Sequence, residues 1–354
     1  MNIIIAPIHE TLFAGRGWMG LDFDKIKEDI ELKNFNYKVT IINFFDAMND
    51  FSLIPVDSIF IYSVSKNNNY LHYIKDCVLN LSKFRKDVVL LPNIDQLYSY
   101  ENKGYQELVK KRLYINNLKG KYFGDIDDYL NQSIKQETPF VHKEILGAGS
   151  IGVKLIKDNN DLRKIAKKNN KIHAFIEGIR KYINIKYRLE KDYKGLKPIK
   201  KYAILNFDKF RAERSQFVIQ DFIPGLKYDF KILIFGDKFY ALKRAVKKND
   251  FRASASGMFE KVTPPIEVLD YAYEIQRVLK VPFVALDIGI SENKSVFLFE
   301  FESIGFGPLT LTDSTSFFIK KDKSWDEIIK ESNLEEEYAN AIHYYITTML
   351  ILGN

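Results

Sequence analysis

The fold of this chain is indicated most clearly by one glycine-rich stretch, Val141-His-Lys-Glu-Ile-Leu-Gly-Ala-Gly-Ser-Ile-Gly-Val153. Gly147, Gly149 and Gly152 have the spacing of a dinucleotide-binding loop, but a loop of that kind opens a helix. Here the alternating run Val153-Lys-Leu-Ile follows the loop, and it predicts a second strand. We therefore expect a hairpin whose flexible glycine turn could hold phosphate oxygens with its backbone N–H groups.

Lys143 lies on the first strand of this hairpin, where its ammonium group could reach the same phosphates. The stretch is not a Walker A sequence, because no Gly-Lys-Ser/Thr closes the loop. Taken alone, it leaves two alternatives equally open: a lid over a phosphate group, and a glycine-rich hairpin without a ligand.

The composition is that of a soluble globular protein with two or three subdomains. The 354 residues are 46% hydrophobic and 28% charged, and no apolar run approaches the roughly 20 residues of a membrane span. A single cysteine, Cys77, excludes a disulfide framework and a cysteine-based zinc site. The first residues do not have the pattern of a signal peptide, so we expect a cytoplasmic protein.

The net charge of +7 permits an anionic partner. Lys, Asn and Ile are all frequent in the chain, which a biased genome could explain, and most of the excess charge is expected on a solvated surface. No basic motif interleaved with aromatic residues supports nucleic-acid binding. We therefore expect neither a nucleic acid nor a membrane as a partner.

Residues 1–95 are predicted to form a parallel α/β domain. Short apolar runs alternate with helical patterns, which is typical of strands covered by helices on both faces. The expected strands are Ile3–Ala6, Tyr37–Ile42, Ser58–Tyr62 and Val88–Leu91, and the expected helices are Phe23–Leu32 and Tyr70–Phe84.

Loops that follow such strands often bind ligands. Two segments qualify, and they could form the pocket for an acceptor substrate. They are His9 to Gly20, with Gly15, Arg16 and Gly17, and Ser63–Asn69. For each single residue, however, ordinary turn chemistry is the favoured interpretation.

Residues 96–354 are predicted to form a second domain. A helix over Glu101–Asn117 leads into a lid subdomain at about 139–222, which includes a basic helical insertion at 158–214. The basic side of this insertion could contact an anionic substrate, although a solvated helix face is the favoured alternative. A C-terminal lobe covers residues 223–354.

From Gln216 onward the pattern returns to strands, and Gly236-Asp237 predicts the turn of an antiparallel hairpin. The expected strands are Phe217–Ile223, Tyr228–Phe235, Lys238–Val246, Phe283–Ile290 and Val296–Glu302. The expected helices are Pro265–Leu279, Asp326–Glu331 and Leu334–Leu352.

Three carboxylates are expected to meet on two neighbouring strands. A short turn separates the strand of Asp287 from that of Glu300 and Glu302. Side chains alternate along a strand, so the two glutamates share one face, and the other face is expected to hold Phe297, Phe299 and Phe301. Carboxylates on one face repel each other unless a cation lies among them. Mg²⁺ prefers oxygen ligands, so a magnesium site is favoured over a solvated face.

The order of these features resembles the ATP-grasp superfamily over roughly residues 96 to 310. It runs from a lysine through a glycine-rich hairpin, a Gln-Asp-Phe-Ile segment, an Asp-x-Lys strand and an arginine to paired carboxylates. The resemblance extends to the ATP-binding domain of glutathione synthetase. It implies a two-lobed α+β domain with antiparallel sheets, preceded by the α/β domain that usually accompanies it.

The resemblance also implies ATP and Mg²⁺ as cofactors. Lys103 and Lys143 would hold the phosphates, under a loop that contains Gly147, Gly149, Ser150 and Gly152. The backbone of Gln220, Asp221, Phe222 and Ile223 would meet the adenine. Asp229 and Lys231 match the family's Asp-x-Arg pair, Lys243 or Arg244 matches its next basic position, and Asp287, Glu300 and Glu302 match its magnesium ligands.

Two positions depart from the family pattern. The metal motif usually ends Glu-x-Asn, whereas this chain has Glu300-Phe-Glu302, which leaves the number of metal ions open. Lys231 stands where the family has arginine, so a planar bidentate donor is missing from the phosphate site.

The resemblance implies an ADP-forming ligase that joins a carboxylate to an amine through an acyl phosphate. The candidate catalytic residues are Arg244, Arg252 and Lys231, with the arginines at the oxyanion and Ser254 and Ser256 nearby. We expect small substrates, such as an acidic sugar, a nucleotide-linked sugar or an amino acid, and a protein that acts alone or as a homodimer.

Two other functions stay open, a small-molecule kinase and a non-catalytic nucleotide-binding protein. A protein kinase is excluded, because Lys143 precedes the glycine loop and the sequence has no His-Arg-Asp catalytic loop.

Overall fold

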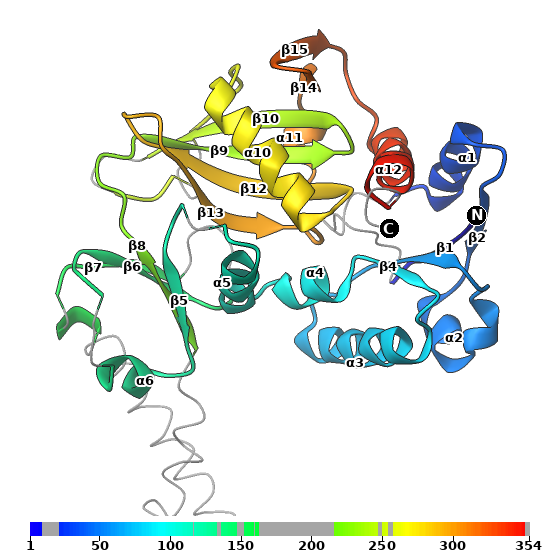
Figure 1. Cartoon of the computed structure of the whole chain (residues 1–354), viewed down its shortest axis with the longest axis horizontal. Coiled ribbons are helices and arrows are strands. Elements are labelled where there is room, and N and C mark those ends of the chain that lie inside the picture. The colour runs from blue at the N-terminus through cyan, green and yellow to red at the C-terminus, as the bar shows by residue number, and fades with distance from the viewer. Residues whose placement is uncertain are drawn as a thin grey trace, which may run out of the picture. The chain divides into compact units, whose positions relative to one another are not determined.

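The computed structural model describes residues 1–8, 21–115, 117–132, 136–146, 152–158, 160–162, 216–246, 250–253 and 258–350. These residues form two compact units (Figure 1), one made of Met1–Leu118 with Ile223–Asn354 and the other of Lys119–Phe222. Nearly all of the basic insertion predicted at 158–214 lies outside the described residues, as do His9, Arg16, Gly147, Gly149 and Ser150.

The first unit begins with the predicted parallel sheet, which the structure confirms. Its strands lie in the order β2-β1-β3-β4. Every residue of β3 is buried, as expected for a central strand covered on both faces. The strands are β1 (Asn2–Ala6), β2 (Lys38–Ile41), β3 (Ser58–Tyr62) and β4 (Val89–Leu91), and the helices are α1 (Phe23–Lys33), α2 (Phe44–Asn49), α3 (Asn68–Phe84) and α4 (Ile94–Ser99), with a 3-10 turn at Phe51–Leu53.

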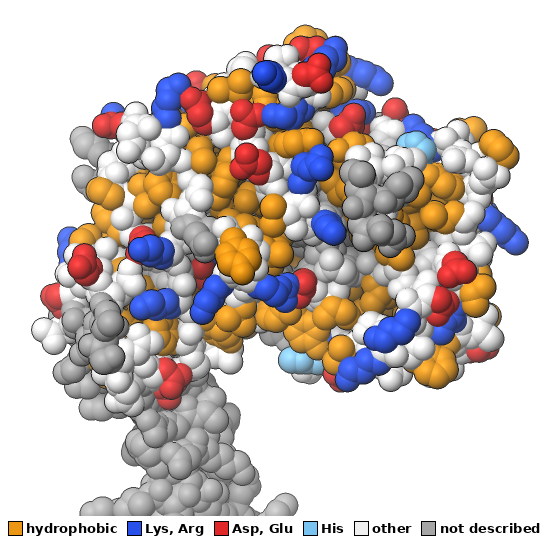
Figure 2. Space-filling view, in the orientation of Figure 1, with side chains coloured by type: hydrophobic (Ala, Val, Ile, Leu, Met, Phe, Trp, Pro, Cys, Tyr) orange, Lys and Arg blue, Asp and Glu red, His pale blue; other side chains and the backbone are white. Residues whose placement is uncertain are grey.

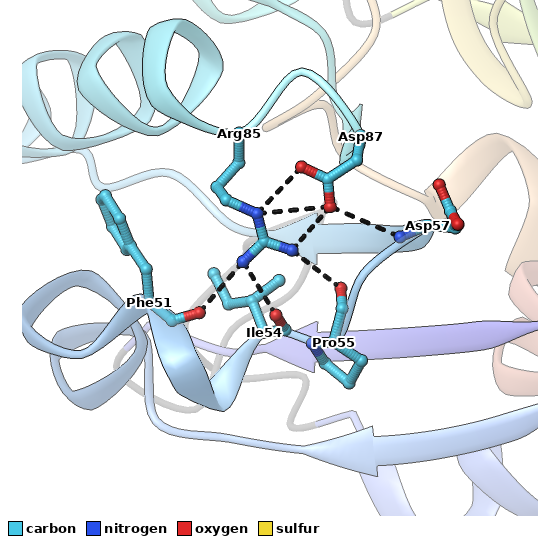
Figure 3. A network of polar contacts seen from close by, with 6 residues as sticks. All are labelled: Phe51, Ile54, Pro55, Asp57, Arg85 and Asp87. Atoms are coloured by element: carbon cyan, nitrogen blue, oxygen red, sulfur yellow. Dashed lines mark hydrogen bonds and ion pairs between the residues drawn. The ribbon is translucent and has the colours of Figure 1, made fainter.

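Arg85 ties together the loops at one end of this sheet (Figure 3). Its guanidinium donates to the carbonyl oxygens of Phe51, Ile54 and Pro55 at 2.9–3.2 Å. A fork of bonds to Asp87, the shortest 2.6 Å, holds the guanidinium in place. The loop after α2 therefore has its carbonyl groups satisfied by one side chain from the end of α3.

The larger sheet of the first unit is antiparallel, in the order β13-β12-β9-β10-β14-β15, with β11 also paired to β10. Helix α10 packs on one face, where Leu269, Ala272 and Ile275 meet Ile232 and Leu286. The strands are β9 (Tyr228–Phe235), β10 (Lys238–Ala245), β11 (Phe259–Glu260), β12 (Phe283–Ile290), β13 (Val296–Glu302), β14 (Ser316–Lys321) and β15 (Ser324–Ile329). The helices are α5 (Lys103–Arg112), α10 (Ile266–Leu279), α11 (Leu309–Thr312) and α12 (Leu334–Tyr344), continued by a π-helical turn at Tyr345–Leu350.

The opposite face of the larger sheet is divided along its length. Side chains two residues apart on a strand share a face, so Asp229, Lys231, Leu233 and Phe235 of β9 point the same way. Leu233 and Phe235 belong to the same hydrophobic core as the N-terminal sheet and α12, and the rings of Phe235 and Tyr338 lie 5.2 Å apart. The other half of this face is polar and carries the charged residues described below.

The second unit contains the predicted hairpin, which the structure confirms. Strands β6 (Phe140–Glu144) and β7 (Val153–Ile156) pair antiparallel, with Lys143 opposite Val153. They lie in a four-stranded sheet of order β5-β8-β6-β7, completed by β5 (Gly120–Phe123) and β8 (Phe217–Asp221). Helix α6 (Ile126–Leu130) joins the core of this unit through Tyr129, which contacts Phe123 and Phe140.

One predicted helix is wrong. Residues 326–331 do not form a helix, because β15 pairs with β14 over Ser316–Ile329. Between the two strands Asp322 adopts φ 44°, as a two-residue hairpin turn requires. A helical pattern over six residues is too short to outweigh that turn. No helix among the described residues has both the length and the apolarity that crossing a membrane requires.

Candidate functional site

Strand register gathers the charged residues predicted for the site from four neighbouring strands. Asp287 on β12 lies opposite Lys231 on β9 and opposite Glu300 on β13. Arg244 on β10 lies opposite Asp229. Residues directly opposite one another in antiparallel strands share a face, so β10, β9, β12 and β13 bring these side chains together on the polar half of the sheet.

A bulge changes one expectation about this face. The register of β12 and β13 shifts between Asp287 and Ile288 and leaves Phe299 as an extra residue. A Cβ atom on Gly289 would lie 2.5 Å from the Phe299 ring, so Phe299 packs on the carboxylate face. The prediction that Phe297, Phe299 and Phe301 share the opposite face is therefore wrong for Phe299, and it is also wrong for Phe297, which lies opposite Gly289. Phe301 does lie in the core under α10.

Arg244 connects two of the carboxylates. Its Nε and Nη2 atoms donate to the two carboxylate oxygens of Asp229 at 2.7 and 2.9 Å, and Nη2 also lies 2.9 Å from Asp287 Oδ2. Arg244 and Asp229 are only 6% and 4% exposed. Burial raises the pKa of Asp229 to about 6, against the opposing effect of Arg244. The guanidinium is thus committed to the carboxylates here, and its predicted contact with an oxyanion stays a proposal.

The two glutamates of β13 differ in their surroundings. Lys103 Nζ lies 3.6 Å from Glu300 Oε1. Burial and the neighbouring Glu300 raise the pKa of Glu302 to about 8, while Lys231 opposes the shift. Tyr100 belongs to the same group, because burial and the charges of Glu101 and Glu302 raise its pKa. Burial and the neighbouring carboxylates therefore both disfavour the charged form of Glu302.

This donor set fits Mg²⁺ by its chemistry. Among the residues that the structure describes, no three acidic, histidine or cysteine side chains are already gathered as a metal cluster. Asp287 and Glu300 nevertheless lie directly opposite each other on adjacent strands, and Glu302 shares the face of Glu300. Carboxylate oxygens are ligands that Mg²⁺ prefers.

Helix α5 contributes polar residues that the sequence analysis did not identify as a group. Lys103, Gln106, Glu107 and Lys110 are all less than 9% exposed. Their spacing of i, i+3, i+4 and i+7 places them on one face of the helix. In the sequence, these polar residues occupy the spacing at which a buried helix face is normally apolar, and that pattern could have identified them.

Lys143 and His142 lie on β6 in the second unit and point to opposite faces, as predicted. His142 is 5% exposed and stacks on Phe217, with ring centroids 5.0 Å apart. Gly152 has φ +75°, and a Cβ atom there would lie 2.8 Å from the Cβ of Glu144. Glycine is therefore required where the chain enters β7.

The predicted adenine-binding segment lies at the end of β8. Gln220 is 2% exposed, and Asp221 accepts a short hydrogen bond from Gln136. The backbone N–H of Asp221 also donates to the backbone carbonyl oxygen of Lys119 at 3.0 Å. Phe222 ends the second unit, and Ile223 begins the returning part of the first.

Other candidate residues are engaged elsewhere. The guanidinium of Arg252 forms a fork with Asp250, with bonds of 2.9 and 2.8 Å. Lys243 pairs with Glu260 at 2.9 Å, which leaves Arg244 as the basic residue of β10 near the carboxylates. In the predicted acceptor loop, Asn67 accepts two backbone hydrogen bonds as the N-cap of α3, a turn role. Ser254 and Ser256 lie outside the described residues.

On the face drawn in Figure 2, acidic and basic side chains of the described residues are interspersed, with hydrophobic side chains between them. That view contains no continuous basic surface.

No protein-family model matches the sequence, and no curated protein matches it. Several solved structures resemble the fold. The D-cycloserine synthetase DcsG is 10% identical, with 96% of this chain and 98% of that chain covered and a TM-score of 0.53. The D-alanine–D-alanine ligase of Bacillus anthracis is 14% identical, with 99% and 98% covered and a TM-score of 0.44. At this low identity, the similarity to the synthetase shows a shared fold and nothing further.

Proposed function

This chain has the ATP-grasp fold, and from that premise we propose that it is an ATP- and Mg²⁺-dependent ligase. The reaction would join a carboxylate to an amine, with ADP and phosphate as products. The proposal rests above all on one observation, the convergence of Lys231, Asp287, Glu300 and Arg244 from four neighbouring strands.

Asp287, Glu300 and Glu302 would hold the magnesium ion, which when bound neutralises charge on the transferring phosphate. Lys231, opposite Asp287 on the next strand, would contact phosphate oxygens from the same face. Arg244 holds Asp287 at 2.9 Å and would keep that carboxylate oriented. Phosphoryl transfer requires mostly positioning and charge neutralisation, and these residues can provide both.

Lys143 and the loop that ends at Gly152 are proposed to hold the phosphates, and Gln220 to Phe222 to meet the adenine. Arg252 is proposed to stabilise the oxyanion that forms when the amine attacks the acyl phosphate. It would have to exchange its present bonds with Asp250 for bonds to the substrate.

Amino acids and small carboxylic acids are the first substrates to test. The D-cycloserine synthetase is among the structures that this chain resembles, and its name denotes a product of amino-acid size. We propose a substrate of similar size for this chain.

The test is to incubate the protein with ATP, Mg²⁺ and panels of carboxylates, with and without amines, and to measure ADP and phosphate. A ligase releases both only when a carboxylate and an amine are present together. ADP accompanied by a stable phosphorylated product would identify a small-molecule kinase instead. Nucleotide binding without turnover across broad panels would favour the non-catalytic alternative.

A further inference from the structure

The outer edge of β13 is covered by side chains instead of by another strand. β13 is the last strand on its side of the described sheet. Outward-facing N–H and C=O groups of such a strand have no partner within the sheet. Three side chains take that place. Asn117 Nδ2 donates to Val296 O at 3.2 Å, Lys110 Nζ donates to Leu298 O at 3.5 Å, and Phe301 N donates to Gln106 Oε1 at 3.4 Å.

The two contacts from α5 are long for hydrogen bonds, but the residues that make them are buried from water. Gln106 and Lys110 are each 2% exposed, and Leu298 and Phe301 are each 1% exposed. Water cannot replace a buried partner, so losing one leaves a backbone group unsatisfied. Both side chains are themselves held. The Gln106 amide also donates to Ser99 O at 3.2 Å, and Lys110 pairs with Glu107.

These contacts lie on both sides of the bulge and of Glu300. Phe299 has no residue opposite it in β12, so the pairing of β13 is weakest there. Leu298 precedes the bulge. The N–H of Phe301 belongs to the peptide group that links Glu300 to Phe301, so Gln106 fixes the backbone orientation of Glu300 itself.

We propose that Gln106, supported by Lys110, is a positioning residue that holds Glu300 and Glu302 of β13 in place to bind a divalent cation together with nucleotide. Gln106 acts through the strand and touches neither ligand. This inference rests on the proposed function, because it assigns the carboxylates of β13 to that cation.

The test measures Mn²⁺ binding in the presence of ADP by electron paramagnetic resonance, for the full chain and its variants. Gln106→Met removes both hydrogen bonds while keeping the volume. We expect its Mn²⁺ affinity to fall 10- to 100-fold, the range typical when a supporting partner of a metal ligand is lost. Glu300→Gln defines the affinity of a site that lacks one ligand.

Gln276 offers a matched control. It is 0% exposed, lies on α10, and donates to the backbone carbonyls of Gly236 and Val281. Gly236 is at the end of β9 remote from Asp229. Gln276→Met should lower thermal stability to a similar extent and change Mn²⁺ affinity by less than about threefold, well below the loss expected at a supporting position.

The outcomes are distinct. Unchanged affinity in Gln106→Met, or an equal loss in Gln276→Met, overturns the positioning role and leaves the proposed function intact. A wild-type protein that binds no Mn²⁺ with ADP overturns both. If Gln106→Met does not fold, the paired change Lys110→Met with Glu107→Gln removes the Leu298 contact without leaving a buried charge, and its affinity is judged by the same limits.

Discussion

Arg244 shows how single residues order the charged face of the large sheet. Its guanidinium contacts both oxygens of Asp229 and one of Asp287. Removing one partner of such a buried group leaves an uncompensated charge, which typically costs about 3–5 kcal/mol. Arg244 is therefore a residue whose loss would affect stability and the site together, so it is a poor choice for testing catalysis alone.

Glu300 is better suited to that test, because its side chain is 27% exposed and lies 3.6 Å from its buried partner Lys103, a longer contact than those of Arg244. We expect Glu300→Gln and Lys143→Ala each to lower ATP turnover by about three orders of magnitude, because each removes a charge that would act on the transferring phosphate. The measurement is ADP release at saturating substrate.

Glu292→Gln and Lys154→Ala serve as matched controls, since both residues are exposed. Turnover within a few-fold of wild type in Glu300→Gln or Lys143→Ala would mean that the site is wrongly placed.

His142 predicts a dependence of stability on pH. Burial, with Lys154 nearby, lowers its pKa to about 4, whereas an unfolded histidine titrates near 6.5. Between these values the unfolded chain binds a proton that the folded chain does not. The stability that the neutral His142 side chain contributes is therefore lost as pH falls from about 6.5 to about 4. Over that range the free energy of unfolding falls by about 1.4 kcal/mol per pH unit.

Urea unfolding, followed by a probe in the second unit, would measure this between pH 4.5 and pH 7. In His142→Phe, the slope of the unfolding free energy against pH should decrease by the amount that one proton contributes. In His72→Gln, at an exposed position, the slope should not change. Equal slopes in all three proteins would contradict the prediction.

At the scale of elements, the hairpin of β6 and β7 depends on the backbone at Gly152. Alanine there would combine a positive φ with a Cβ atom 2.8 Å from the side chain of Glu144. Gly225 has φ +73° but no atom within 4 Å of the Cβ position. Gly225→Ala therefore measures the backbone strain alone, about 1 kcal/mol.

We expect Gly152→Ala to destabilise its hairpin by more than Gly225→Ala destabilises its turn, because overpacking adds about 1–3 kcal/mol to the backbone strain. Hydrogen exchange of the amides in Phe140–Glu144 and Val153–Ile156 would measure the effect locally. Similar increases in exchange at the two sites would show that the contact with Glu144 relaxes without cost.

At the scale of the whole molecule, the first unit has one core that extends from the N-terminal sheet to the large sheet and α12. Phe235 is 0% exposed in that core. Phe235→Ala should cost about 3–5 kcal/mol, and because the core is shared, the amides of β3 should lose protection together with those of β9.

Hydrogen exchange read by mass spectrometry would follow both strands, with Phe259→Ala as a control at a position 58% exposed. Unchanged protection of β3 in Phe235→Ala would support a separately folding domain over residues 1–95, as the sequence analysis proposes.

Local patterns in the sequence were sufficient for most of the elements and for the face that the two glutamates of β13 share. Four apolar strand patterns with helical patterns between them predicted the parallel sheet. Gly147 to Gly152, followed by Val153-Lys-Leu-Ile, predicted a hairpin, and the period of two along β13 placed Glu300 and Glu302 on one face. These features follow from dihedral preferences and periodicities within about ten residues, which are written in the sequence directly.

The basic partners of these carboxylates came from tertiary structure alone. Three such features depend on positions far apart in the chain. They are the ion pair of Arg244 with Asp287, the bulge at Phe299, and the hydrogen bonds of Gln106 and Lys110 to the edge of β13. No local period carries that information, because it depends on which strands become neighbours and which edge a helix covers. For the same reason, the role of the buried polar residues of α5 can be recognised only when the edge of β13 is seen to lie against them.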